Sequence, residues 1–150
     1  LYPIAENAVA ADTLLRLSEL LDSPALKTRA LALLTSLSPS SEEQEFLAAP
    51  FARTIQRTLV RENVTIFLAG VTTTKAFLPL IRAVHSLFVP FKAVRFLDPE
   101  RDRARWRTMA SVSEAGPAAM VCRGAACADP TNDPERLVEI LARAAATPGT

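Results

Sequence analysis

The sequence has few of the residues that usually carry metal, nucleophilic or redox chemistry. Among its 150 residues are four glycines, two cysteines and a single histidine, His85. A lone histidine needs thiolate or carboxylate partners to bind zinc, and none lies close to His85 in the sequence. The motifs G-x-S-x-G, G-x-x-x-x-G-K-[ST] and G-x-G-x-x-G are also absent. These absences favour a protein without a bound metal, a cofactor or a self-contained catalytic site.

Charge and hydropathy give no indication of a nucleic-acid or membrane partner. The 17 basic and 16 acidic residues leave a net charge of +1. No apolar run approaches the roughly 20 residues that cross a bilayer. The most basic stretch, residues 92–107, is interleaved with acidic residues and is interpreted as a solvated helix face. Two cysteines are too few for a secreted disulfide scaffold, so a cytoplasmic location is expected, with an organelle of a eukaryotic cell as the alternative.

The first 62 residues are expected to be helical. Apolar residues recur at helical spacing over residues 7–21 and 24–37, and the break Asp22-Ser23-Pro24 separates the two stretches. Helices joined by so short a break form an antiparallel hairpin. Residues 38–41 are expected to be a turn that caps a third, linking helix, whose first turn holds the acidic residues of 42–45.

Residues 63–146 are predicted to form a small α/β domain of βαβαβα order, followed by a tail at residues 147–150. The expected strands are residues 64–71, 93–97 and 118–122, each followed by a helix. Short crossovers favour parallel strands with right-handed connections. The strand order 2-1-3 is preferred, because the first strand is the most apolar and the second resembles an edge strand. The expected fold class is therefore α/β, with a helical hairpin and a linking helix before a three-stranded parallel sheet that carries helices on its faces.

The stretch from Ala118 to Pro134 is the most distinctive part of the sequence. It combines an apolar strand that ends at Cys122, a loop that holds Cys127, and the helix start Asp133-Pro134, which supplies an N-cap and a first helical position. The pattern Val-Cys-x4-Cys-x2-Pro-x2-Asp-Pro-Glu, which begins at Val121, resembles the C-terminus of the bacterial YyaL proteins. It is equally similar to their eukaryotic relatives, the spermatogenesis-associated thioredoxin-domain proteins. Residues 7–17 resemble a helix late in the same proteins.

This resemblance implies a place within a larger protein. Proteins of this family resemble a two-part architecture. An N-terminal thioredoxin-like domain is followed by an (α/α)6 toroid similar to that of N-acylglucosamine 2-epimerases and six-hairpin glycosidases. Residues 1–62 would then be the end of the toroid, and residues 63–146 a terminal α/β domain. The partners implied are the toroid and the thioredoxin-like domain of the parent chain, and the start at Leu1, without Met or a signal-peptide pattern, fits an excised piece. The function implied is a structural or interaction module.

Two alternative functions remain open from the sequence. One is the binding of a small anion or a sugar phosphate by loops that follow two strands, because the carboxyl ends of parallel strands share one sheet edge. The glycines, hydroxyls and charge for this site would come from Gly70, Thr72, Thr73, Thr74, Arg123 and Gly124.

The other alternative is a thiol redox module that uses Cys122 and Cys127. Catalytic pairs more often use Cys-x-x-Cys at a helix start, where the helix dipole lowers one thiol pKa, and here the helix starts well after Cys127. Cys122 is expected to point into the core and Cys127 to lie in an accessible loop. A structural disulfide is also possible if the two Cα atoms lie within ~7 Å. The pair is therefore not expected to be catalytic.

Overall fold

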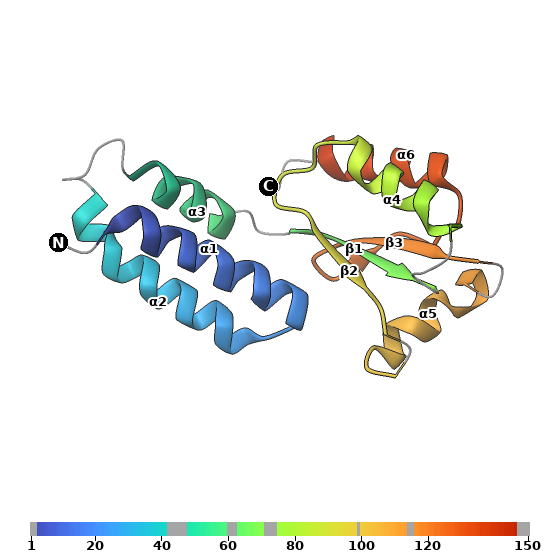
Figure 1. The fold of residues 1–150 in the computed structure, drawn as a ribbon, viewed down its shortest axis with the longest axis horizontal. Coiled ribbons are helices and arrows are strands. Elements are labelled where there is room, and N and C mark those ends of the chain that lie inside the picture. The colour runs from blue at the N-terminus through green and yellow to red at the C-terminus, as the bar shows by residue number, and fades with distance from the viewer. Residues whose placement is uncertain are drawn as a thin grey trace. The chain divides into compact units, whose positions relative to one another are not determined.

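The computed structural model divides the chain into two compact units, each of which is described by itself (Figure 1). The helical unit spans residues 1–60 and the α/β unit spans residues 61–150. The structure describes residues 3–41, 48–59, 63–70, 75–98, 100–113 and 116–146. Within these ranges, no helix combines the length and the apolar character that crossing a bilayer requires.

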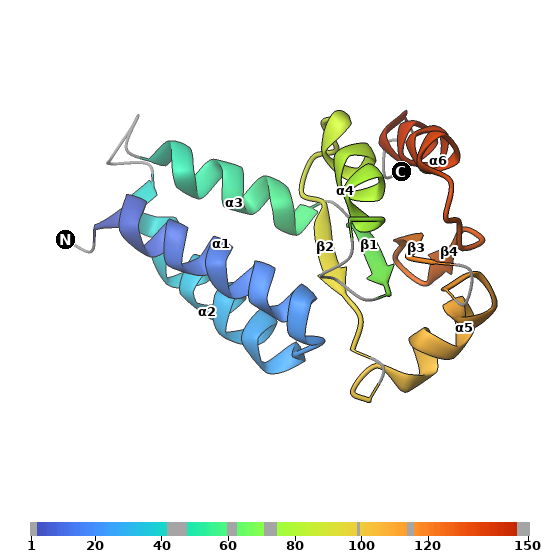
Figure 2. The same cartoon turned by 45° about the vertical axis from the view of Figure 1, so that its right-hand side comes forward.

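The helical unit contains three helices, α1 (Ile4–Leu21), α2 (Pro24–Ser41) and α3 (Ala49–Leu59). Helices α1 and α2 form the expected antiparallel hairpin, and α3 lies beside them (Figure 2). The hairpin turns at Asp22, whose backbone is left-handed with φ of 50°. The core between the helices consists of small and branched apolar side chains: Ala11, Leu15, Ala30 and Leu34, with Phe51 and Ile55 of α3 packed against them.

The turn expected at residues 38–41 is wrong, because α2 continues through Pro39 to Ser41. A proline removes one helical hydrogen bond. The buried Leu34 and Leu37 hold this part of α2 against the core, which offsets that loss. The acidic residues expected to open the third helix lie outside the described residues, and α3 begins later, at Ala49.

A buried ion-pair network fastens α3 to α1. The side chain of Arg57 is only 4% exposed, and its Nε donates to Asp12 Oδ1 at 2.9 Å. Its Nη1 donates to Glu19 Oε2 at 3.2 Å. Asp12 also accepts from Arg16 Nε at 2.8 Å. Since a buried guanidinium is costly without partners, these carboxylates make the position of α3 on α1 specific.

The α/β unit contains a four-stranded mixed sheet of order β2-β1-β3-β4. Its elements follow the chain in the order β1 (Val64–Ala69), α4 (Phe77–Ser86), β2 (Ala93–Phe96), α5 (Arg103–Ser113), β3 (Ala118–Arg123), β4 (Ala126–Cys127) and α6 (Pro134–Ala146). The α/β class and the relative order of the first three strands agree with the expectation. Strands β1 and β2 are parallel, with Thr65 opposite Ala93.

The expected all-parallel sheet of three strands is wrong in two respects. Strand β3 runs antiparallel to β1, with Val64 opposite Arg123 and Ala69 opposite Ala118. A fourth strand, β4, then pairs with β3 as a hairpin. Helix α5 lies across one face of the sheet between β2 and β3, and β3 starts beside the end of β1 (Figure 1). A connection of this length permits either strand direction.

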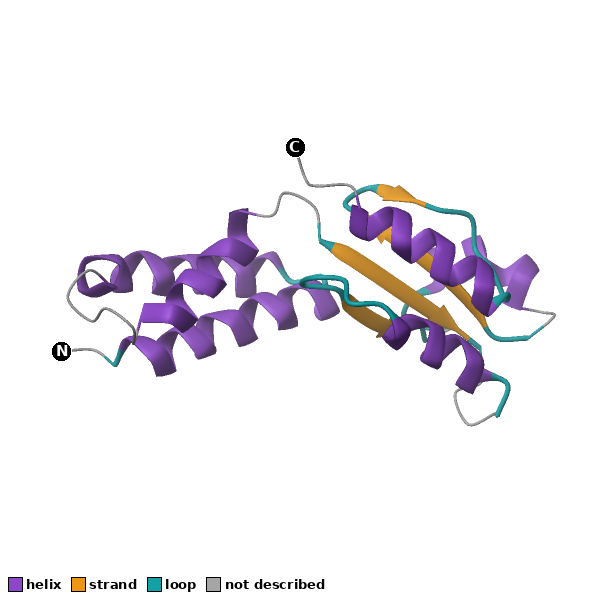
Figure 3. Ribbon diagram, turned by 90° about the horizontal axis from the view of Figure 1, so that it is seen from above, coloured by secondary structure: helices purple, strands orange, loops and turns teal. Residues whose placement is uncertain are grey.

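Helices cover both faces of the sheet (Figure 3). Helices α4 and α6 pack together on one face, over a core cluster that includes Ile66, Leu68 and Val121. Helix α5 covers the other face, where Phe67, Met120 and Cys122 form a second cluster with Met109. Alternate residues of β1 and β3 therefore enter different cores, which explains why both strands are apolar almost throughout.

We predict that Arg57→Ala destabilises the helical unit by about 3 kcal/mol, because Asp12 and Glu19 lose a buried partner. Arg53→Ala, on the exposed side of the same helix, is the matched control and should change the stability by less than about 0.5 kcal/mol. Urea unfolding followed by far-UV circular dichroism measures both variants, and the fluorescence of Trp106 follows the α/β unit separately. Equal effects of the two substitutions would contradict the role assigned to the network.

Candidate functional site at the disulfide hairpin

The β3–β4 hairpin carries the distinctive stretch of the sequence. Its register places Cys122 opposite Cys127 and Arg123 opposite Ala126, which leaves a two-residue turn of Gly124 and Ala125. Gly124 has φ of 56°, a backbone conformation that glycine adopts without strain. A glycine at the first position of a two-residue turn is typical of tight β-hairpins.

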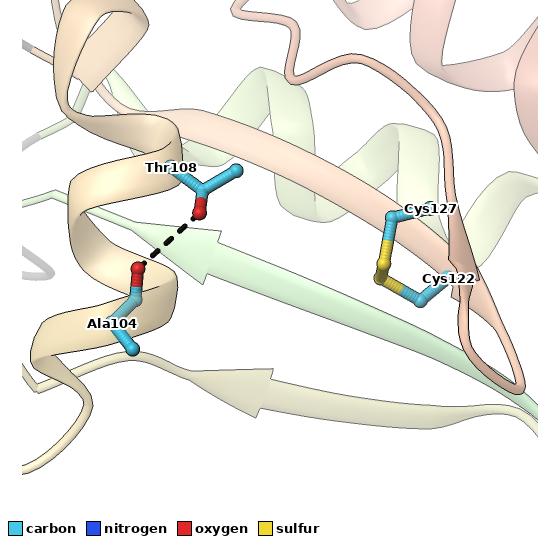
Figure 4. Close-up of a disulfide and its surroundings, with 4 residues drawn as sticks. All are labelled: Ala104, Thr108, Cys122 and Cys127. Atoms are coloured by element: carbon cyan, nitrogen blue, oxygen red, sulfur yellow. Dashed lines mark hydrogen bonds between the residues drawn. A yellow bond between two sulfur atoms is a disulfide. The ribbon is translucent and has the colours of Figure 1, made fainter.

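A disulfide links Cys122 and Cys127 across the hairpin (Figure 4). Their Cα atoms are 4.0 Å apart. The backbone N–H of Ala128 donates to the carbonyl of Val121, so the neighbouring cysteine pair occupies a position between ladder hydrogen bonds, where side chains approach most closely. Both thiols are therefore consumed in one cross-link, which answers the question that the sequence left open.

The two cysteines differ sharply in their exposure to solvent. Cys122 is 3% exposed and lies in the cluster with Met109 and Met120, as expected from the sequence. Cys127 is exposed, on the outermost strand of the sheet. A thiolate released at Cys122 would be buried among apolar side chains, where the charged form is disfavoured. Attack by an external thiol on the exposed sulfur of Cys127 therefore has a poor leaving group.

The segment after β4 stays attached to β3 and then caps α6. Thr131 and Ala119 exchange two backbone hydrogen bonds, of 2.7 and 2.8 Å. Asp133 then accepts from the backbone N–H of Glu135 at 2.9 Å, which confirms the N-cap expected from the sequence. Between Ala128 and Thr131 the outer segment holds one residue more than β3 does, and this extra residue forms a bulge that contains Pro130.

Arg123 has a structural role in the hairpin. Its guanidinium donates to the backbone carbonyl of Ala144, in the last turn of α6. A cation at this position satisfies a helix-end carbonyl and interacts favourably with the helix dipole. Arg123 therefore fastens the end of β3 to the end of α6, and this contact occupies the guanidinium that we expected to bind an anion.

The two loops expected to share one ligand lie at opposite ends of the sheet. Gly70 follows the C-terminal end of β1, whereas Arg123 lies opposite Val64 at its N-terminal end. The expectation that both loops lie at one sheet edge is therefore wrong, because it required a parallel β3. Thr72, Thr73 and Thr74 lie outside the described residues.

Gly70 supports a close contact between chain segments. A Cβ atom built on Gly70 would lie 2.9 Å from the Cα atom of Pro117, and the φ of Gly70 is +134°. Only glycine fits this combination of space and backbone conformation. The contact brings the end of β1 against the residue that precedes β3.

An open pocket of about 520 Å³ lies between the hairpin segment and α6. One wall is the segment from Cys127 to Thr131, and the other is formed by Arg136, Ile140 and Arg143 of α6. Sequence reasoning missed these three residues, although their spacing of four and three places them on one helix face. The pocket offers two guanidinium groups with an apolar side chain between them, opposed by the carboxylate of Asp129.

Two further titratable groups, Lys92 and Asp98, serve as helix and turn caps. The Lys92 ammonium donates to the carbonyls of Val84 and Leu87 at 2.6 and 2.9 Å, and burial lowers the pKa of this lysine. Backbone N–H groups of Arg101 and Glu100 donate to Asp98 and lower the pKa of its carboxyl. His85 is exposed, and among the residues that the structure describes, no group of three or more His, Cys, Asp or Glu side chains could hold a metal ion.

Comparisons with known proteins return no relative. No family model, no curated protein and no solved structure matches the chain.

We predict that loss of the disulfide destabilises the α/β unit and that the two cysteines contribute unequally. A bridge that closes so short a loop stabilises the fold by about 2 kcal/mol. Cys127→Ser should cost about this amount, while Cys122→Ser should cost about 1–3 kcal/mol more, because its hydroxyl would be buried among apolar groups. Urea unfolding followed by Trp106 fluorescence measures both variants. An equal loss in the two variants would contradict the assigned asymmetry of burial.

Proposed function

We propose that this chain is a structural and interaction module, the C-terminal part of a larger protein that resembles the YyaL-like family, with no self-contained catalysis. The observation that carries the proposal is the apolar surface of the helical unit. Each of its three helices exposes large apolar side chains, among them Val9 at 57%, Leu31 at 40% and Leu59 at 73%. Exposed apolar side chains mark a contact surface where they form a contiguous patch, and Leu59 is part of such a patch on α3.

The apolar surface includes a shallow groove along α3. This groove has a volume of about 440 Å³ and follows one helix face, through Ala48, Phe51, Ala52, Ile55, Gln56 and Leu59. The small residues Ala48 and Ala52 permit close approach of a neighbour, and the spacing of three and four residues suits the ridges of another helix. A neighbouring helix of the parent protein would bury this face, as an array of helical hairpins requires.

The α/β unit has no cysteine at the position where its connectivity would place a redox motif, which supports a binding role over thiol chemistry. A βαβ motif followed by a ββα motif, in a sheet of order β2-β1-β3-β4, has the connectivity of thioredoxin-like domains. A redox motif of that fold lies at the start of the helix that follows β1. The corresponding residues here, Gly70 to Lys75, contain no cysteine. We therefore propose a thioredoxin-like domain without the redox motif, used as a scaffold.

The thiol redox alternative is supported only by the disulfide itself. Its cysteines lie in the β3–β4 hairpin and not at the start of a helix, where catalytic pairs more often lie. We propose a cytoplasmic location, in which the bridge persists because the buried Cys122 is a poor leaving group. This location requires that the disulfide persist in millimolar glutathione, and rapid reduction would contradict it.

The proposal predicts that the reading frame around this chain encodes further helical hairpins upstream. When the upstream segment is coexpressed with this chain as a separate polypeptide, the two should bind each other. Leu59→Asp should weaken this binding about tenfold or more, because a charge would be buried in an apolar contact. The matched control is Leu78→Asp on α4, a residue that is 49% exposed in the α/β unit. Equal binding by both variants, or a frame without upstream helices, would contradict the proposal.

A further inference from the structure

The pocket beside the disulfide has a distinctive pattern of charge. Three residues of α6 line the pocket in order along the helix: the cation Arg136, the apolar Ile140 and the cation Arg143. Seven residues of α-helix span ~10 Å, which sets the separation of the two arginine positions. The opposite wall provides Thr131, Asp129 and the exposed Cys127. The lining therefore carries two positive charges and one negative charge.

From this pattern, we propose that the pocket binds a small organic dicarboxylate whose two carboxylates are separated by an apolar spacer. Each carboxylate would accept hydrogen bonds from one guanidinium, and the spacer would lie on Ile140. Arginine is suited to this role because its planar donors match a carboxylate. The pocket volume of about 520 Å³ lies within the range of small-molecule sites.

Arg136 already has a protein partner that a ligand carboxylate would replace. Arg136 Nη1 lies 3.2 Å from Glu139 Oε2, in a pair whose side chains are 54% and 58% exposed. Arg143 is also engaged in an interaction of its own. Exposed ion pairs contribute little stability, so a carboxylate held in the pocket competes with Glu139 at small cost.

The outer wall is built to hold its shape, and it disfavours a peptide strand as the ligand. The disulfide fixes Cys127, and the hydrogen bonds of Ala128 and Thr131 to β3 fix the rest of the segment. Pro130 has no backbone N–H, and the bulge interrupts the regular edge that an added strand needs. A small acid requires no such edge.

Amide chemical shifts of the full chain, recorded during titration with suberate, test the proposal. Suberate should give saturable shifts at residues 127–131 and along α6. Succinate, whose carboxylates lie much closer together than the two arginine positions on α6, and octanoate, which has one carboxylate, should bind about tenfold more weakly. A capped Glu-Leu-Glu peptide should also bind more weakly than suberate.

Substitutions on α6 provide a second, directional test. Arg136→Gln and Arg143→Gln should each weaken suberate binding about tenfold. Glu139→Gln should tighten it about twofold or more, because the competing carboxylate is removed. Arg103→Gln on the exposed surface of α5 is the matched control and should leave binding unchanged.

The proposal is overturned if ~20 mM suberate produces no saturable shifts, or shifts outside the pocket. It is also overturned if Glu139→Gln leaves the affinity unchanged, or if the peptide binds more tightly than suberate. The α6 substitutions leave the apolar groove of α3 intact, so failure of this test does not bear on the docking role of the helical unit.

Discussion

The antiparallel pairing of β3 with β1 is the constraint on which the α/β unit depends. It starts β3 beside the C-terminal end of β1, which allows the close contact of Gly70 with Pro117. It ends β3 at the opposite end, where the chain turns into β4 and the disulfide closes the hairpin. Arg123 then reaches the last turn of α6. A parallel β3 would remove all of these contacts at once.

The same pairing separates two ends of the sheet that have different properties. At the end of β1 that leads to α4, the residues that follow Gly70 contain no cysteine. At the other end lie the disulfide, the β3–β4 turn and the contact of Arg123 with the last turn of α6. From there the outer segment runs back along β3, through the bulge at Pro130, to the capped start of α6, and it forms one wall of the pocket beside two arginines. The small-molecule site that we propose lies between this outer segment and α6, whereas the apolar contacts that we propose belong to the helical unit. The two functions would operate without sharing a residue.

Much of this architecture is predictable from local patterns, and the exceptions have physical causes. The α1–α2 hairpin follows from apolar periodicity and the Asp22 break, and the cap of α6 follows from Asp133 and Pro134. The direction of β3 does not follow, because both of its faces are buried and its apolar pattern is the same in either direction. Strand β4 has only two residues, Ala126 and Cys127, too few to show any alternation. Pro39 predicts a break that does not occur, since the buried Leu34 and Leu37 before it hold this end of α2 against the core.

The candidate site also combines features that the sequence predicts with features that only the fold reveals. The burial of Cys122 and the exposure of Cys127 follow from the sequence, but the place of Cys127 on β4 rather than in a loop, and its bridge to Cys122, depend on the hairpin register. The arginines of α6 are separated from that loop by a capped turn, and only the fold brings them to one pocket. Conversely, Arg123 and Gly70 are neighbours only in the parallel arrangement that the chain does not adopt.

Nuclear Overhauser contacts between the backbones of β1 and β3 test the account most directly. Antiparallel pairing predicts contacts between Val64 and Arg123 at one end of the two strands, and between Ala69 and Ala118 at the other. Parallel pairing would instead connect Val64 with Ala118 and Ala69 with Arg123. The second pattern would contradict the positions of the disulfide, of the Arg123 contact with α6 and of the pocket beside them.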